Sequence, residues 1–150
     1  MRQMDYGRAH RMMEWEGVRV RICHLRRLRC LVRDFRELEV WRKAHEVTLA
    51  VYQMTRMFPR EEVYGLTAQM RRSAASVCAN IAEGCGRRGG RELARFLQIA
   101  AGSASELEYH LLLAADLKLV DAAAQASVAS LLTQVRRMLS GFLRTLRAKG

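Results

Sequence analysis

The sequence has little proline and no long hydrophobic run. Proline occurs once in 150 residues and half of the residues are hydrophobic, which excludes a proline-rich linker and argues against a mostly disordered chain. No apolar run approaches the roughly 20 residues that would cross a bilayer, and the arginine-bearing N-terminus lacks the apolar stretch of a signal peptide. We therefore expect one globular domain in the cytoplasm, with no membrane partner.

The cysteines are too few, and wrongly spaced, for a disulfide scaffold or a zinc site. Cys78 and Cys85 lie seven residues apart in a helical pattern, about 10 Å along a helix axis, whereas a disulfide needs Cα atoms within roughly 7 Å. Cys23 and Cys30 repeat the interval, and no C-x-x-C or paired histidine completes a metal site. We interpret all four as buried or incidental thiols, and we expect no metal and no cofactor.

Acidic residues are also in the minority. Lys plus Arg is 26 against 15 for Asp plus Glu, a net charge of +11, which favours a polyanionic partner. No phosphate-binding loop, zinc-protease motif or di-iron spacing occurs, so we expect a protein that is not an enzyme. Two functions remain open: a nucleic-acid-binding accessory protein, or a protein–protein scaffold whose charge only aids solubility.

Residues 1–32 lack the periodicity of the rest. They hold eight arginines and three acids, a net of +5, and Val18–Ile22 alternates like a strand although no partner strand is evident. Three explanations stay open: a disordered basic arm that touches nucleic acid, an irregular extension packed on the domain, or upstream codons translated from a wrongly placed start. We expect these residues to be dispensable for folding, with the domain spanning residues 33–150.

From residue 37 onward, apolar residues recur at helical spacing. The pattern predicts a helix ended by Pro59, a second stopped by the glycines within 84–90, a third from about Arg91, and a fourth capped by Asp121. Connections of two to eight residues require antiparallel neighbours. We therefore expect an all-α protein, an up-down-up-down antiparallel four-helix bundle.

The third and fourth predicted helices carry more apolar residues than one stripe needs, namely Ile99, Leu112, Leu113, Leu132, Leu139 and Leu143. A wide apolar arc must be covered. We expect a second copy of the chain to cover it in a ring-shaped homo-oligomer, although the arginine-rich N-terminal arm is an alternative cover.

Several short segments carry a resemblance to a known protein family, and they occur along the chain in the same order as in that family. They are RDFRELEVW at 33–41, KAH at 43–45, FPREE at 58–62, GLT at 65–67, QMRRSA at 69–74, NIAEG at 80–84, FL at 96–97 and SELE at 105–108. Together they resemble the four-helix-bundle family of 23S rRNA-intervening-sequence proteins, which is related to the accessory variability proteins of diversity-generating retroelements. The resemblance implies a non-enzymatic bundle that tends to form rings of five; in the retroelement relatives, the basic surface of the ring engages RNA and the reverse transcriptase, whereas the role of the intervening-sequence proteins themselves is poorly defined. Cys78 stands where this family usually has proline, so we expect a weaker kink in the second helix.

The predicted topology gathers charge at one end, where helices one and three begin and helices two and four end. That end has eleven basic and five acidic residues, a sum of +6, against −1 at the other end. We predict that nucleic acid binds there at Arg87, Arg88, Arg91, Arg95, Arg144 and Arg147, with Arg71, Arg72, Arg136 and Arg137 on the flank as the next candidates.

Four further expectations concern individual residues and their partners. One of the two flank arginines of the second helix should pair with Glu106 or Glu108, whereas Glu106 and His110 should form a surface pair. Glu83 should be held by an arginine or by backbone donors, because a carboxylate near a helix C-terminus is unfavourable. The glycines within 84–90 are stop signals first and at most a weak anion site.

Overall fold

The computed structural model describes residues 13–15, 18–20 and 34–148. The chain divides into two units, residues 1–31 and residues 32–150. In the first unit, β1 (Met13–Trp15) and β2 (Val18–Val20) form an antiparallel pair in which Met13 lies opposite Val20. The partner that was not evident for the segment at 18–22 is the neighbouring segment 13–15, which is too short to show alternation in the sequence. The all-α class is confirmed for residues 34–148, where every regular element is helical; the other expectations for residues 1–32 lie outside the described residues.

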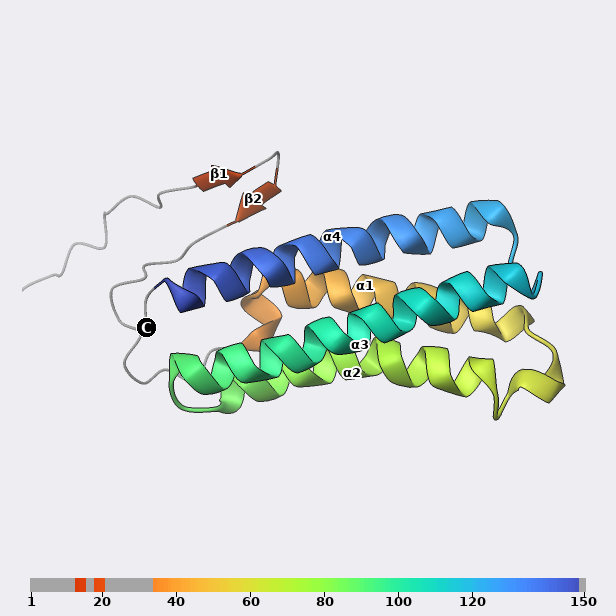
Figure 1. Cartoon of the computed structure of the whole chain (residues 1–150), viewed down its shortest axis with the longest axis horizontal. Coiled ribbons are helices and arrows are strands. Elements are labelled where there is room, and N and C mark those ends of the chain that lie inside the picture. Colours follow the sequence, from red (N-terminus) through yellow and green to blue (C-terminus); the bar gives the residue numbers. More distant parts are fainter. Residues whose placement is uncertain (1–12, 16–17, 21–33, 149–150) are drawn as a thin grey trace, which may run out of the picture. The chain divides into compact units, whose positions relative to one another are not determined.

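Four helices form the second unit: α1 (Glu39–Met54), α2 (Leu66–Gly86), α3 (Gly90–Asp116) and α4 (Ala122–Arg147). Short 3₁₀ helices flank α1: η1 (Phe35–Glu37) before it, and η2 (Thr55–Met57) and η3 (Arg60–Glu62) after it. Figure 1 shows that α1 and α3 run one way and α2 and α4 the other. Both α1 and α3 pack against α2 and against α4. The four-helix bundle and its up-down-up-down order are confirmed.

The helix boundaries follow local chemistry. Asp121 caps α4 as predicted, since its side chain accepts a hydrogen bond from the Ala124 backbone N–H at 2.8 Å. The end of α1 comes earlier than predicted: the helix stops at Met54 and tightens into η2. Because Pro59 disfavours helical geometry in the residue before it, Phe58 is extended and the helix ends before it, with its last turn in 3₁₀ geometry.

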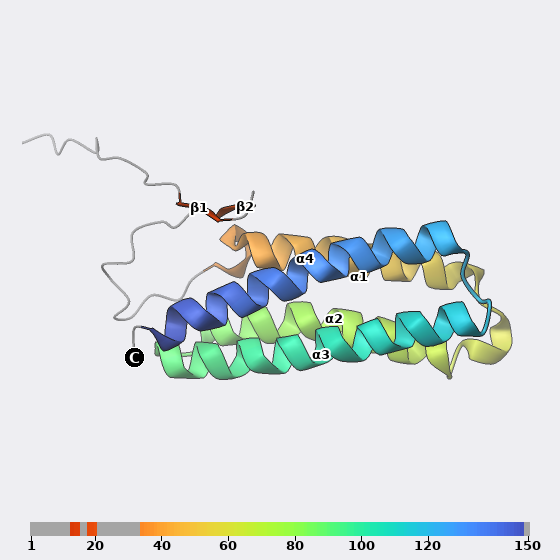
Figure 2. The same ribbon diagram turned by 45° about the horizontal axis from the view of Figure 1, so that its top comes forward.

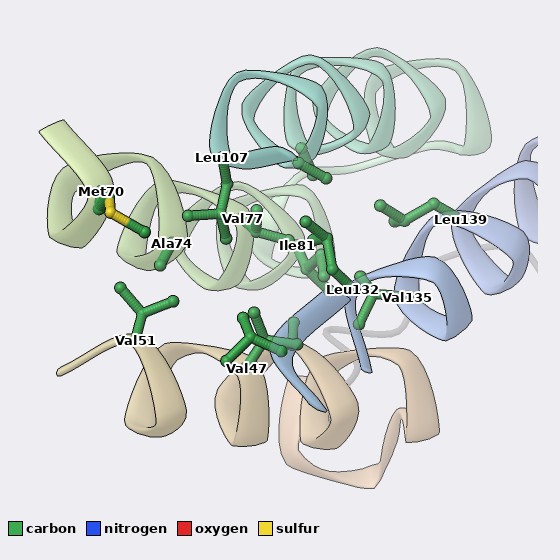
Figure 3. Close-up of a cluster of buried hydrophobic side chains, with 14 of the residues drawn as sticks. Val47, Val51, Met70, Ala74, Val77, Ile81, Leu107, Leu132, Val135 and Leu139 are labelled. Carbon is green, nitrogen blue, oxygen red and sulfur yellow. The ribbon is translucent and has the colours of Figure 1, made fainter. Parts of the chain in front are cut away.

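The core is a continuous apolar cluster supplied by all four helices. Its most deeply buried large side chains include Val51, Met70, Ile81, Leu97, Leu107, Leu132, Val135 and Leu139, several of which are drawn in Figure 3. Removing such a side chain costs about 2–5 kcal/mol in a well-packed core. No helix of the described residues is long and apolar enough to span a membrane.

The prediction that α3 and α4 carry a surplus of exposed apolar side chains is mostly wrong. Leu132 and Leu139 are buried in the core, and Leu113 and Leu143 are partly buried against it. Each helix packs against two neighbours, so its apolar arc is wider than a single stripe. Of the six predicted residues, Ile99 and Leu112 stay exposed.

Candidate nucleic-acid interface

The connection between α2 and α3 forms one end of the bundle. It consists of Arg87, Arg88 and Gly89, and Gly89 adopts a φ of +94°, which glycine tolerates without strain. Figures 1 and 2 show that α1 begins and α4 ends at this same end. The topology therefore brings arginines from three helices to one end, as the sequence predicted.

We call this the basic end. Nine of its predicted basic residues are described, against five acidic ones, a net of +4. The basic residues are Arg36, Arg42, Lys43, Arg87, Arg88, Arg91, Arg95, Arg144 and Arg147, and the acidic ones are Asp34, Glu37, Glu39, Glu83 and Glu92. Arg33 and Lys149, also predicted there, lie outside the described residues.

Two of these arginines share an aromatic support. Arg87 pairs with Glu83 one turn earlier, and its guanidinium lies 5.4 Å from the centre of the Phe96 ring. Arg95 lies 3.6 Å from the Glu92 carboxylate and 5.7 Å from the same ring. Phe96 is only 8 % exposed, so it gives both guanidinium groups a fixed apolar surface. The expectation that an arginine holds Glu83 is confirmed.

A close approach of α2 and α3 places Phe96 under Arg87. A Cβ atom on Gly84 would meet the Phe96 Cβ at 2.9 Å and the Leu93 Cδ1 at 3.1 Å. Only glycine therefore lets the two helices lie this close. Farther along the same contact, the Ser76 and Ser103 hydroxyls hydrogen-bond at 2.9 Å, and the Asn80 side-chain amide donates to the Ser76 carbonyl at 2.8 Å.

The other predicted arginines of this end are exposed. Within the described part of the chain, Arg88, Arg91 and Arg147 form no ion pair, so their guanidinium groups keep all their donors for an anion. Arg144 is exposed near the end of α4. Arginines in this state can bind phosphate with two parallel hydrogen bonds.

The four flank arginines do not form one surface. The Arg71 Nε donates to the Thr55 Oγ1 at 2.8 Å, and its guanidinium lies 5.0 Å from the Tyr52 ring centre, so Arg71 is held against α1. Arg136 instead pairs with Glu108 across α4 and α3. Arg72 and Arg137 are exposed.

The predicted pairing of an α2 arginine with Glu106 or Glu108 is therefore wrong. Arg71 lies on the side of α2 that faces α1, whereas Glu108 reaches α4. Glu106 and His110 do not form an ion pair either, and the His110 Nδ1 is buried without a hydrogen-bond partner among the described residues.

Sequence reasoning missed a ladder of rings at the start of α1. The Arg36 guanidinium lies 4.5 Å from the Phe35 ring centre, and Phe35 and Trp41 are 4.8 Å apart between ring centroids. The His45 ring then stacks on Trp41 at 5.1 Å with an interplanar angle of 8°. The signal was available, because Trp41 and His45 are four residues apart and share one face of a helix.

Two side chains of the described residues, Cys78 and Lys43, have a shifted pKa. Burial raises the pKa of the Cys78 thiol, and the opposing hydrogen bond between Thr48 and Cys78 is the weaker effect, so Cys78 stays protonated at neutral pH. The hydrogen bond to Glu46 raises the pKa of Lys43, which keeps that side chain cationic. Cys78 is a free thiol, and Cys85 is buried in the core, as expected. No three His, Cys, Asp or Glu side chains within the described ranges come together as a metal site.

Comparison with solved structures shows the same fold elsewhere. A protein of unknown function from the S23 ribosomal protein family of Bacteroides thetaiotaomicron matches at 22 % identity with a TM-score of 0.63, over 69 % of this chain and 97 % of that one. A search of curated proteins found no match. The family described as 23S rRNA-intervening sequence protein matches residues 36–141, so the chain belongs to that family.

Proposed function

We propose that this protein is a non-enzymatic accessory factor that binds the backbone of RNA or DNA with its basic end. The observation that carries the proposal is the gathering of exposed arginines from α3, α4 and the α2–α3 connection at one end, three of them without an ion pair among the described residues. The family name, with its link to ribosomal RNA, supports RNA as the polyanion.

Backbone binding without base selectivity fits the chemistry of this end. Guanidinium groups bind phosphate oxygens, which position a nucleic acid but carry no sequence information. The ion pairs of the basic end are also weak. Arg87 and Arg95 pair with the half-exposed carboxylates of Glu83 and Glu92, and such surface pairs contribute only about 0–1 kcal/mol. A phosphate can therefore replace the carboxylate at little cost.

We further propose that the chain assembles into a ring-shaped homo-oligomer, a pentamer. Exposed Ile99, Tyr109 and Leu112 on α3 support self-association, and the number five comes from the family resemblance. A ring of parallel subunits would gather their basic ends on one face. Light scattering at micromolar concentration checks the mass, and a monomer mass throughout that range would exclude the ring.

A salt titration tests the binding proposal. For the unmodified protein, log affinity should fall against log salt with a slope of about −0.9 per phosphate contact on duplex DNA, or about −0.7 on single strands. Changing Arg87, Arg88, Arg91 and Arg95 together to Gln should weaken binding to unrelated sequences equally and flatten the slope.

A comparison variant changes Arg136 and Arg137 to Gln, which removes charge from the flank but leaves Arg71 and Arg72 in place. It should keep most of the slope if the basic end is the binding surface. An unchanged slope in the basic-end variant, with a loss in the flank variant, would move the interface to the flank. The alternative function, a scaffold for a protein such as a reverse transcriptase, predicts no salt-dependent retention on RNA or DNA by either.

A further inference from the structure

Aromatic side chains follow one another along the side of α1 that faces α2, with an arginine at each end of the row. We call this the aromatic strip; it consists of Trp41, His45 and Tyr52 on α1, with Arg36 before them and Arg71 on α2. Trp41, His45 and Tyr52 follow at intervals of four and seven residues, which places them on one side of a helix. The Tyr52 contact with Arg71 shows that this side faces α2.

The first exposed ring of the strip, that of His45, is held in place by the side chains beneath it, Trp41 and Phe35. Trp41 is partly buried against the core, and Phe35 packs on it, so the indole cannot turn freely. His45 stacks on that fixed indole in a nearly parallel arrangement and is itself exposed. An exposed ring held flat by a buried one offers a platform for another flat ring at little entropic cost.

The second exposed ring, that of Tyr52, is held by a cation instead of by another ring. Tyr52 is 44 % exposed, and the Arg71 guanidinium lies against its ring, fixed by the hydrogen bond to Thr55. Seven residues separate His45 from Tyr52, about 10 Å along the helix axis. Two exposed rings thus share one side of α1 with two arginines, Arg36 before them and Arg71 against Tyr52.

From this arrangement we infer that the aromatic strip binds single-stranded nucleic acid by stacking unpaired bases on His45 and Tyr52. The inference rests on the proposed function and adds the class of nucleic acid. Stacking on aromatic side chains, combined with a basic track for the backbone, is how proteins hold single strands without sequence preference. In a duplex the bases are already stacked, so their faces are not available.

Charge selects this occupant over a second copy of the chain. At the strip, the Arg71 guanidinium lies on the Tyr52 ring and forms no ion pair among the described residues, whereas Arg36, on the Phe35 ring, pairs with Asp34. A second copy docked face to face would bring the same positive charges together, whereas a phosphate backbone brings the opposite charge.

The test compares strands that differ only in their bases. A single-stranded oligonucleotide, an abasic strand with the same number of phosphates, and the duplex of the same sequence are each titrated with the full chain at one salt concentration. The wild-type protein should bind the base-bearing single strand about fivefold tighter or more than the abasic strand, the lower limit of one stacking contact.

Three variants separate stacking from structure. Changing His45 and Tyr52 together to Ala should remove the preference for the base-bearing strand, whereas changing both to Phe should keep it, because the rings remain. Tyr64→Ala is the matched control, since Tyr64 is 93 % exposed and lies outside the strip, in the connection between η3 and α2. It should keep the wild-type preference, and the salt slope should be unchanged in every variant.

The outcomes distinguish the two proposals. Equal affinity of the wild-type protein for base-bearing and abasic strands, with the salt slope present, would overturn the stacking inference and leave backbone binding intact. Loss of the preference in the Phe variant, or its persistence in the Ala variant, would also overturn the inference. Failure of the wild-type protein to bind any of the three ligands at low salt would overturn the proposed function together with the inference.

Discussion

The two ends of the bundle use their carboxylates differently. At the end opposite the basic end, the Glu62 carboxylate accepts from the Leu66 backbone N–H at 2.9 Å where α2 begins, and the Asp121 carboxylate does the same for α4. At the basic end, Glu83 and Glu92 instead pair with Arg87 and Arg95 beside the α2–α3 connection. Acids thus cap the long helices α2 and α4 at the opposite end, whereas the only helix that an acid of the basic end caps among the described residues is the short η1, at Asp34.

The helix starts at the basic end show the same contrast. Leu38 and Gly89 precede α1 and α3, and neither gives a side-chain hydrogen bond to the helix. The first turns of α1 and α3 hold Glu39 and Glu92 instead, which lie near the positive end of the helix dipole without capping it. Acids at the opposite end therefore satisfy backbone donors of the long helices, whereas those at the start of α1 and α3 act through charge.

The largest expected effect concerns the contact that builds the basic end. Gly84→Ala should lower the free energy of unfolding by about 1–3 kcal/mol, because the new Cβ would overlap Phe96 and Leu93 and force α2 and α3 apart. Gly86→Ala is the matched control: nothing lies within 4 Å of a Cβ there, so we expect no loss and a gain of up to about 1 kcal/mol. Urea denaturation measures both, and equal stability of the two variants would show that α2 and α3 separate without cost.

The second prediction concerns the opposite end. Asp121→Ala should cost about 1 kcal/mol of stability, since the Ala124 N–H loses its capping partner. Its affinity for nucleic acid should not decrease, because the change removes a negative charge far from the basic end. Thermal or urea unfolding measures the first effect and a salt titration the second; a cost well below that of other N-caps would contradict the proposed division of roles.

Much of the bundle was predictable because helical periodicity is local. The spacing of Val47, Val51, Ile81 and Leu107 marks buried faces without knowledge of neighbours, and Asp121 is a capping residue wherever a helix starts. The charge of the basic end was also predictable, since a topology of four antiparallel helices fixes which termini meet.

What the sequence did not reveal depends on rotation of the helices about their axes. Periodicity could not tell that Arg71 turns toward α1 and Arg136 toward α3, because both arginines lie beside apolar stripes of similar width. For the same reason Leu132 and Leu139 were assigned to an outer surface although they face the core. The Phe96 support needs the α2–α3 distance at Gly84, which no spacing in the sequence encodes.

The smallest effect on stability is expected for the acids of the basic end. Changing Glu83 and Glu92 together to Gln should alter the free energy of unfolding by less than about 1 kcal/mol, because both ion pairs are half-exposed surface pairs within one helix. The same change should strengthen binding to RNA or DNA and steepen its salt dependence. Arg87 and Arg95 would then no longer exchange a carboxylate for each phosphate, while Phe96 still supports their guanidinium groups. Changing Glu61 to Gln at the opposite end removes one acid as a control and should leave the affinity nearly unchanged, since screening limits charge effects to about 8 Å at physiological salt. Weaker binding by the Glu83 and Glu92 variant, with its fold intact, would mean that the two ion pairs orient the arginines for the ligand and do not compete with it.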